Sequence, residues 1–276
     1  MSKIKKGDIV TRNSYNNDIV FHVENIIKQK NASPIAILKG VTLRIEASAY
    51  IEDLKLVDQD DVNRELERFE NIINIKTNEL LEKYNENIDK RKFIFEDNRG
   101  LILHLDGDKK YAEKSARVYE KFNLKAVVKN IRENRQPFEI RDLLNRYNPD
   151  IVIITGHDGM IKKGYNYNDI YNYRNSKYFI RTVEEARRWE QGENKLAIFA
   201  GACQSYYEAI MEAGANFASS PARILIDFMD PLIIAEKIAV TPETKYISMA
   251  DIRDSLRNGE KGISGVGTFG KMKINM

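Results

Sequence analysis

The sequence has a single cysteine, Cys203, among 276 residues, and this scarcity excludes an internal disulfide framework. A reducing, intracellular setting is therefore the expectation. Histidine is almost as rare, and the three histidines and the cysteine lack the spacing of a metal site, so we expect no metal. No run of about 18 apolar residues occurs, and the N-terminus lacks an apolar signal segment. We therefore expect a soluble, unsecreted protein with no membrane span.

An excess of charge of one sign is lacking as well. The net charge of +3 is too mild to require nucleic acid or an acidic membrane as a partner. Nucleotide-binding loops are also missing, because no Walker A pattern occurs. The glycine-rich stretch 265–270 matches GxGxxG but lies near the C-terminus without a following helix, so we expect a hairpin or tail there. The sequence gives no reason to expect a cofactor.

The first two parts of the chain differ in pattern. Residues 1–57 contain short β-branched runs separated by turn-rich pieces, which predicts a small SH3-like β-barrel with no catalytic feature. Residues 58–93 are charged with one narrow apolar stripe, which predicts a helical linker. The β-branched runs are DIVTRN, DIVFHVENII, PIAILKG and VTLRIEA, and the stripe consists of Leu66, Phe69, Ile73, Leu80, Tyr84 and Ile88.

The remainder, residues 94–276, alternates between apolar runs and amphipathic stretches. Such strand–helix alternation with continuously apolar strands predicts an α/β domain with a parallel sheet and helices on both faces. The predicted strands are GLILHLDGD, KAVVKNI, DIVIITGHDG and KLAIFAGA. The predicted helices include KKYAEKSARVYEKF, PFEIRDLLNRYN, YFIRTVEEARRWEQ and SYYEAIMEAG.

Polar and reactive side chains follow three of these strands. Asp106 and Asp108 end the first, His157 ends the third and Cys203 follows the fourth. Because function gathers at the carboxyl ends of strands in an open α/β sheet, we expect the imidazole and the thiol at one edge. The alternative for Cys203 is a buried thiol that packs as a small hydrophobe.

The order of His157 and Cys203 along the chain distinguishes between families of cysteine enzymes. In papain-like enzymes the cysteine precedes the histidine, and glutamine amidotransferases have a histidine downstream, whereas no histidine follows His157 here. His157 precedes Cys203 by 46 residues, and caspases have a histidine about 50 residues upstream of their cysteine. FAGACQS together with IITGHDG thus resembles the caspase/clostripain/gingipain group. The resemblance implies Cys203 as nucleophile and His157 as base.

An oxyanion hole in such a site needs backbone donors beside both groups, and we expect the amides of Cys203 and of Asp158 or Gly159. The chain departs from the group by having His-Asp where His-Gly is usual. It also has Gly201 where some arginine-specific members carry an acidic residue, so a carboxylate that reads arginine must lie elsewhere.

Asp106 and Asp108 are the first candidates for this carboxylate, although their Asp-Gly-Asp sequence is equally typical of a turn, and Asp227 and Asp230 come next. Glycines at the strand ends would let substrate backbone approach closely. Gly156 and Gly201 are these glycines, and the other candidate substrate-binding residues besides Gly201 are Gln204, Ser219 and Ser220.

Longer motifs extend the resemblance over nearly the whole chain. KGDIV, LHLDGD, DIVIITGHD, NYRNSKYF, IFAGACQS and AGANFASSPAR occur in this order, and together they resemble the YabG family of sporulation-specific peptidases from spore-forming Firmicutes. The resemblance implies a cysteine endopeptidase of the mother-cell cytoplasm, associated with the forming spore coat. Its partners would be spore coat and cortex-associated proteins, cleaved after arginine.

Two further expectations complete the sequence analysis. The alternative function is a degenerate receiver-like binding module, although Thr155-Gly156-His157 stands where a receiver needs its phosphoacceptor aspartate. The basic junction DKRKFIFEDNRG contains Arg91 and Arg99, so an arginine-specific peptidase is expected to cleave itself there.

Overall fold

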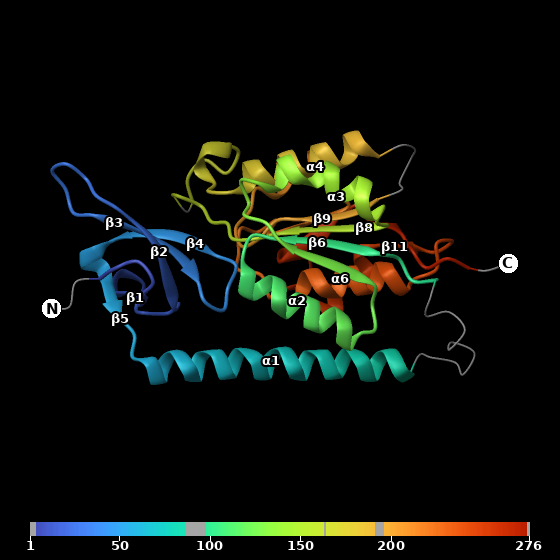
Figure 1. Ribbon diagram of the computed structural model, residues 1–276, viewed down its shortest axis with the longest axis horizontal. Helices are drawn as coiled ribbons and strands as arrows, with labels where there is room; N and C mark the ends of the chain where they lie inside the picture. Colours follow the sequence, from blue (N-terminus) through green and yellow to red (C-terminus); the bar gives the residue numbers. More distant parts are fainter. Residues whose placement is uncertain (1–3, 87–97, 163, 191–195, 275–276) are drawn as a thin grey trace.

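The computed structural model describes residues 4–86, 98–162, 164–190 and 196–274 (Figure 1). Its N-terminal part is a five-stranded antiparallel sheet with the strand order β4-β3-β2-β1-β5. Apolar side chains such as Val10, Val23 and Leu38 fill its interior. The strands are β1 (Ile9–Arg12), β2 (Phe21–Ile27), β3 (Ile35–Gly40), β4 (Glu46–Tyr50) and β5 (Leu54–Leu56).

One predicted strand of this part is wrong. The run Val41–Ala47 has the alternation of a strand, but β4 begins only at Glu46, and residues 41–45 leave the sheet. Arg44 and Ile45 contact the loops that contain Asp158 and Cys203 instead: the Arg44 carbonyl accepts the amides of Asp158 and Cys203, and Ile45 forms an isolated bridge with Asp158. Residues 41–44 form bends, so the half-apolar pattern here reflects burial of Arg44 and Ile45 against another part of the molecule.

Helix α1 (Gln59–Glu86) follows and runs alongside the rest of the chain (Figure 1). Its predicted apolar stripe packs against the second part of the molecule: Ile73 is buried, and the Phe69 ring centroid lies 6.2 Å from that of Tyr111. The helix is therefore docked along this stripe. The side chain of Tyr84 and all of Ile88 lie outside the described residues.

The second sheet has six strands in the order β12-β10-β9-β8-β6-β7, and only β12 is antiparallel to its neighbour. This mostly parallel sheet confirms the predicted α/β class. The strands are β6 (Ile102–Asp106), β7 (Ala126–Asn130), β8 (Ile151–Thr155), β9 (Ala197–Ala200), β10 (Phe217–Ser219) and β12 (Ile263–Gly265).

Helices cover both faces of this sheet, as predicted. α3 (Gln136–Tyr147), α4 (Ser176–Trp189) and α5 (Tyr207–Glu212) share one core cluster with it. α2 (Lys109–Lys121) and α6 (Asp230–Val240) share another with the opposite face, and α1 joins this second cluster through Ile73.

The glycine-rich stretch near the C-terminus forms no hairpin. β12 pairs with β10, whereas β13 (Thr268–Phe269) pairs with β11 (Tyr246–Ile247). The two strands on either side of Gly267 therefore have different partners.

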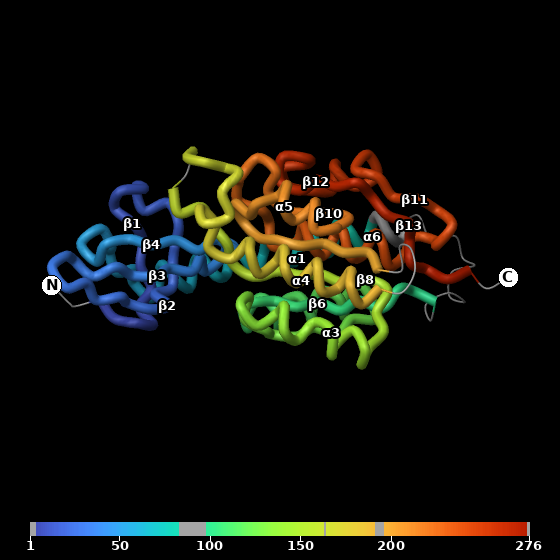
Figure 2. Tube along the Cα trace, turned by 90° about the horizontal axis from the view of Figure 1, so that it is seen from above, coloured from blue at the N-terminus to red at the C-terminus, as the bar shows by residue number. Residues whose placement is uncertain are grey.

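The N-terminal sheet lies at one end of the larger sheet (Figures 1 and 2). This end is where β6, β8 and β9 finish, because the loops after β8 and β9 bond to the segment between β3 and β4. The carboxyl edge of the parallel sheet is thus covered by the chain's own N-terminal part. Within the described residues, no helix combines the length and apolar character that crossing a membrane requires.

Candidate active site

Two neighbouring strands bring His157 and Cys203 to the same edge. β8 ends two residues before His157 and β9 ends three residues before Cys203. The two strands pair in parallel, so both loops leave the sheet on the same side. Both side chains are fully buried, and Sγ of Cys203 accepts the amide N–H of Ile226 at 3.4 Å. Cys203 packs with the apolar residues of the N-terminal sheet, so that sheet contributes to its burial.

Burial keeps both groups uncharged. It raises the pKa of the Cys203 thiol to about 12 and lowers the pKa of His157 to about 4, with the Lys39 charge acting on His157 in the same direction. Nε2 of His157 lies 3.3 Å from the carbonyl oxygen of Gly40. Among the described residues, Nδ1 of His157 has no hydrogen-bond partner. The imidazole is therefore held at one nitrogen and has the other for accepting a proton.

The carbonyl oxygen of Arg44 lies between the two loops. The amides of Cys203 and Asp158 both donate to it, each with a donor–acceptor distance of 3.2 Å. Two convergent backbone donors on one carbonyl form the arrangement of an oxyanion hole. The amide of Gly159 donates instead to the carboxylate of Asp158 at 2.8 Å, so of the two expected donors after His157 only Asp158 faces this carbonyl.

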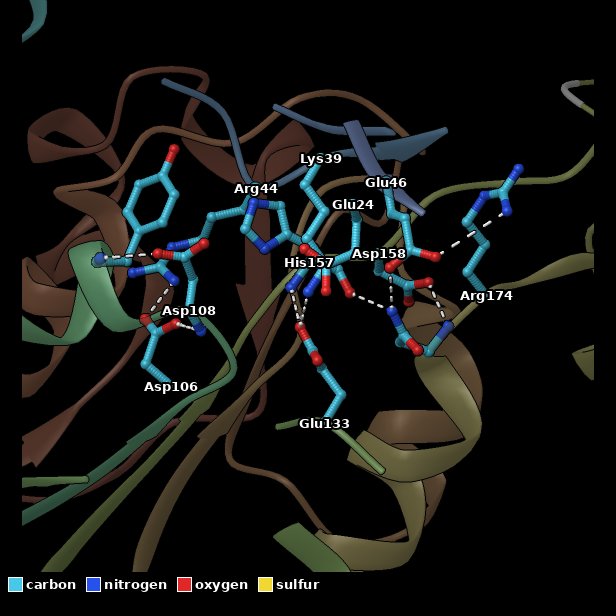
Figure 3. A network of polar contacts seen from close by, with 12 residues as sticks. Glu24, Lys39, Arg44, Glu46, Asp106, Asp108, Glu133, His157, Asp158 and Arg174 are labelled. Carbon is cyan, nitrogen blue, oxygen red and sulfur yellow. Dashed lines mark hydrogen bonds and ion pairs between the residues drawn. The ribbon is translucent and has the colours of Figure 1, made fainter. Parts of the chain in front are cut away.

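The side chain of Arg44 enters a pocket at the end of β6. Its guanidinium pairs with Asp106 (Figure 3). It also lies 4.6 Å from the ring centroid of Tyr111 and 5.5 Å from that of Phe228. Cations are attracted to aromatic faces at such distances. Arg44 is only 1% exposed, and Asp106 is fully buried. One carboxylate between aromatic walls is a pocket suited to a guanidinium.

The carboxylate of Asp106 is kept ionised and fixed in position, so it can pair with a positively charged group. Burial alone would raise its pKa, but Arg44 and the other partners outweigh this and hold the pKa of Asp106 below its usual value. The hydroxyl of Thr155 and the amide of Asp108 each donate to its carboxylate at 2.9 Å. These donors fix the carboxylate and stabilise its ionised form.

The other candidate carboxylates have different partners. The side chain of Asp108 caps α2 by accepting the amides of Lys110 and Tyr111 at 2.8 and 3.2 Å. Asp-Gly-Asp thus provides both a guanidinium ligand and a helix cap. Asp227 forms an ion pair of 3.0 Å with Lys76. Asp230 accepts the backbone amides of Asp227 and Arg257, each at 3.1 Å.

Asp158, which stands where the caspase/clostripain/gingipain group usually has glycine, ties three loops together with its carboxylate. It accepts the hydroxyls of Ser176 and Ser205, the latter at 2.9 Å, and the amide of Asn175 at 2.8 Å. Ser205 belongs to the Cys203 loop, and Asn175 and Ser176 belong to the start of α4. Asp158 therefore fixes the His157 loop relative to the Cys203 loop.

The remaining candidates support the Cys203 loop from behind. Gly201 has φ +113°, and a Cβ there would meet Oγ of Ser219 at 2.3 Å, so only glycine fits. Ser219 donates to the carbonyl of Ala202 at 2.8 Å, and Ser220 accepts the amide of Gln204 at 3.1 Å. The side-chain oxygen of Gln204 accepts the amide of Met160 at 3.2 Å. The two serines and the glutamine thus hold backbone in place.

Two residues of the site were missed by the sequence analysis. Arg44 stands in the part expected to lack catalytic features. Glu133, on the loop after β7, accepts the amide of His157 at 2.8 Å and lies 3.8 Å from Lys39 (Figure 3). A Cβ on Gly156 would lie 2.5 Å from the Glu133 carboxylate. The expectation that Gly156 admits substrate backbone is therefore wrong, because its space is taken by Glu133.

Comparisons with known proteins bear on this arrangement. A family model described as YabG peptidase U57 matches residues 5–276. The chain belongs to the YabG peptidase family. It is 35% identical over 280 residues to the sporulation-specific protease YabG of Bacillus subtilis (strain 168). This alignment covers 98% of the chain and 97% of the relative. No solved structure matches the chain. Membership of the YabG family confirms the resemblance drawn from the motifs. Among the described residues, no group of three or more histidine, cysteine or acidic side chains could hold a metal ion.

Proposed function

We propose that this YabG-family chain is a cysteine endopeptidase that cleaves after arginine, with Cys203 as nucleophile and His157 as general base and acid. One observation carries the proposal. The carbonyl of Arg44 accepts the amides of Cys203 and Asp158, and its guanidinium pairs with Asp106. A substrate arginine before a scissile bond would make the same contacts. The carbonyl is thus hydrogen-bonded to the backbone of the residue that carries the only thiol of the chain.

The chemistry follows from these positions. His157 takes the thiol proton, and Sγ of Cys203 attacks the carbonyl carbon while the amides of Cys203 and Asp158 stabilise the oxyanion. The imidazolium then protonates the leaving amine, and water hydrolyses the thioester to release the new carboxylate. Asp106 provides selectivity, because a neutral side chain would leave its buried charge unpaired.

The architecture that goes with this function has three parts. We propose a caspase-like peptidase domain over residues 94–276, a helical linker over 58–93 and an SH3-like barrel over 1–57. The mostly parallel sheet with histidine and cysteine at neighbouring strand ends supports the first. The five-stranded antiparallel sheet supports the last.

The proposed substrates are spore coat and cortex-associated proteins, cleaved in the mother cell during sporulation. The name of the Bacillus subtilis relative, a sporulation-specific protease, supports this setting. The receiver-like alternative has no such support, because the matched family consists of peptidases. Incubation with a mixed peptide library, followed by identification of the residue before each cut, tests the proposed specificity directly.

A matched pair of variants tests the arginine pocket. We expect Asp106→Asn to lower kcat/KM for arginyl peptides by about 10²-fold or more, because a buried guanidinium loses its counter-charge, which costs about 3–5 kcal/mol. Asp108→Asn is the control: asparagine caps a helix as well as aspartate does, so the arginine preference should persist. Thermal unfolding checks that both variants are folded. Full arginine preference in Asp106→Asn would place the pocket elsewhere.

A further inference from the structure

The segment from Lys39 to Ser48 lies across the whole candidate active site. Lys39 is 3.8 Å from Glu133 at one end, and Ser48 accepts a hydrogen bond of 2.8 Å from Arg174 at the other. Between them, Arg44 occupies the Asp106 pocket and the amide pair described above. The segment therefore occupies the position of a bound substrate.

We propose that residues 43–46 are a built-in substrate of this site, that Cys203 of the same chain cleaves the Arg44–Ile45 bond, and that the uncut segment excludes other substrates. The inference rests on the proposed function and adds to it a cleavage site and a form of self-inhibition. Neither follows from arginine specificity alone.

Both sides of the Arg44–Ile45 bond are held. After the bond, Ile45 bridges to Asp158, and the amide of Glu46 donates to the carbonyl of Asp158 at 2.7 Å. The Glu46 carboxylate accepts a hydrogen bond of 2.9 Å from the side chain of Asn175. Before the bond, Leu43 packs against the core cluster that contains Cys203 and Ile226. Contacts on both sides of a carbonyl are what an endopeptidase needs to position a peptide bond.

The burial of Arg44 is costly unless the site is built for it. Taking a guanidinium out of water costs several kcal/mol, which only good partners offset. Asp106, Tyr111 and Phe228 all belong to the second part of the molecule, so the N-terminal sheet places its arginine in a pocket made elsewhere. A surface loop that merely joined β3 and β4 would have no need of these contacts.

The cleavage step balances with water as the only co-reactant. Sγ bonds to the Arg44 carbonyl carbon, the bond to the Ile45 nitrogen breaks, and the thiol proton passes through His157 to that nitrogen. Water then releases Arg44 as a carboxylate and restores the thiol. The products are residues 1–44 and a chain that begins at Ile45.

N-terminal sequencing and denaturing intact-mass measurement of the freshly purified full chain over time test the inference. The activity probe, measured in parallel, is acetyl-Val-Thr-Leu-Arg carrying a fluorogenic amide. We expect a new N-terminus reading Ile-Glu-Ala-Ser and a peptide-hydrolysis rate that rises at least about tenfold once the cut segment has dissociated, because a tethered segment competes at millimolar effective concentration. The half-time of cleavage should not change on tenfold dilution, since the step is intramolecular.

Three variants sharpen the result. Cys203→Ala and Arg44→Gln should stay uncut, whereas Arg64→Gln, which changes an exposed arginine, should be cut at the wild-type rate. The wild-type chain remains decisive even if Arg44→Gln does not fold. A wild-type chain that hydrolyses the probe at a constant rate and stays whole at Arg44 would overturn the inference and leave the proposed function standing.

Other outcomes separate the two hypotheses further. A chain that neither cuts itself nor hydrolyses any arginyl peptide would overturn the proposed function as well. A cut only in the basic junction would support the earlier expectation and contradict this inference. Arg91 of that junction lies outside the described residues, and the guanidinium of Arg99 donates to the carbonyls of Phe122 and Asn123 at 3.2 and 2.8 Å. Cleavage after Arg44 in the Cys203→Ala variant would also contradict the inference that Cys203 cuts its own chain.

Discussion

Replacing Cys203 by alanine is expected to lower kcat for arginyl peptides by at least about 10⁴-fold, because no other thiol exists to form the acyl-enzyme. The fold should survive. The buried thiol has weak polar contacts with the backbone of Ile226, to the amide at 3.4 Å and to the carbonyl at 3.9 Å, and its removal leaves a small cavity that costs about 1 kcal/mol. Steady-state kinetics and thermal unfolding measure the two effects separately.

Cys203→Ser is the companion variant, because it nearly preserves the volume and removes only the thiol chemistry. We expect it to be as stable as wild type and inactive. Turnover near the wild-type rate in either variant would end the peptidase proposal and favour the reading of Cys203 as a buried structural thiol. Loss of activity together with loss of folding in both variants would contradict the expected small structural role.

His157→Ala is expected to lower kcat by about 10³-fold or more, because the thiol loses its base and the leaving amine its acid. The thiol itself remains. With a pKa of about 12 for Cys203, the thiolate fraction rises about tenfold per pH unit as the pH increases towards that value. Alkylation of Cys203 by iodoacetamide in this variant should therefore be slow at pH 7 and accelerate steadily at higher pH.

His22→Ala is the matched control for the histidine. His22 lies on β2, and its side chain is 41% exposed, so its removal should leave both kcat and the alkylation rate unchanged. If His157→Ala kept wild-type activity, another group would have to be the base. A pH-independent alkylation rate would contradict the protonated thiol that the structure indicates.

The meeting of His157 and Cys203 at one edge could be predicted from the sequence. Alternating apolar strands and amphipathic helices force a parallel sheet, and a parallel sheet places successive carboxyl ends together. No side-chain contact was needed for this step. The roles of the residues that support the two loops, such as Asp158 and Ser219, could not be predicted, because they depend on which hydroxyl reaches which carboxylate or carbonyl.

The position of Arg44 could not be predicted either, and the reason is physical. A loop that buries part of its side chains against another part of the molecule can have the same β-branched, half-apolar pattern as a strand in a sheet. Periodicity reports that one side of a segment is buried and says nothing of what buries it. The contact between Arg44 and Asp106 joins residues 62 positions apart, which local patterns do not detect.

The separate roles of Asp106 and Asp108 could not be predicted either, although the two residues are close in sequence. Both belong to one Asp-Gly-Asp motif, and either could have been the helix cap or the guanidinium ligand. The end of β6 decides, because Asp106 is the last residue of the strand and is fully buried, whereas Asp108 immediately precedes α2.

The hydrogen-bonding pattern of the N-terminal sheet has a consequence for a chain cut after Arg44. β1, β2 and β3 would belong to the short piece, and β4 and β5 to the long one, yet β3 pairs with β4 and β1 with β5. Soon after the cut, the protein would behave as a pair of complementing fragments that still travel together through gel filtration. Arg44 would then remain in its pocket as a bound product. Activity would begin only when the fragment of residues 1–44 dissociates. The dissociation rate of this fragment, rather than the rate of the cleavage step, would then determine when the enzyme becomes active.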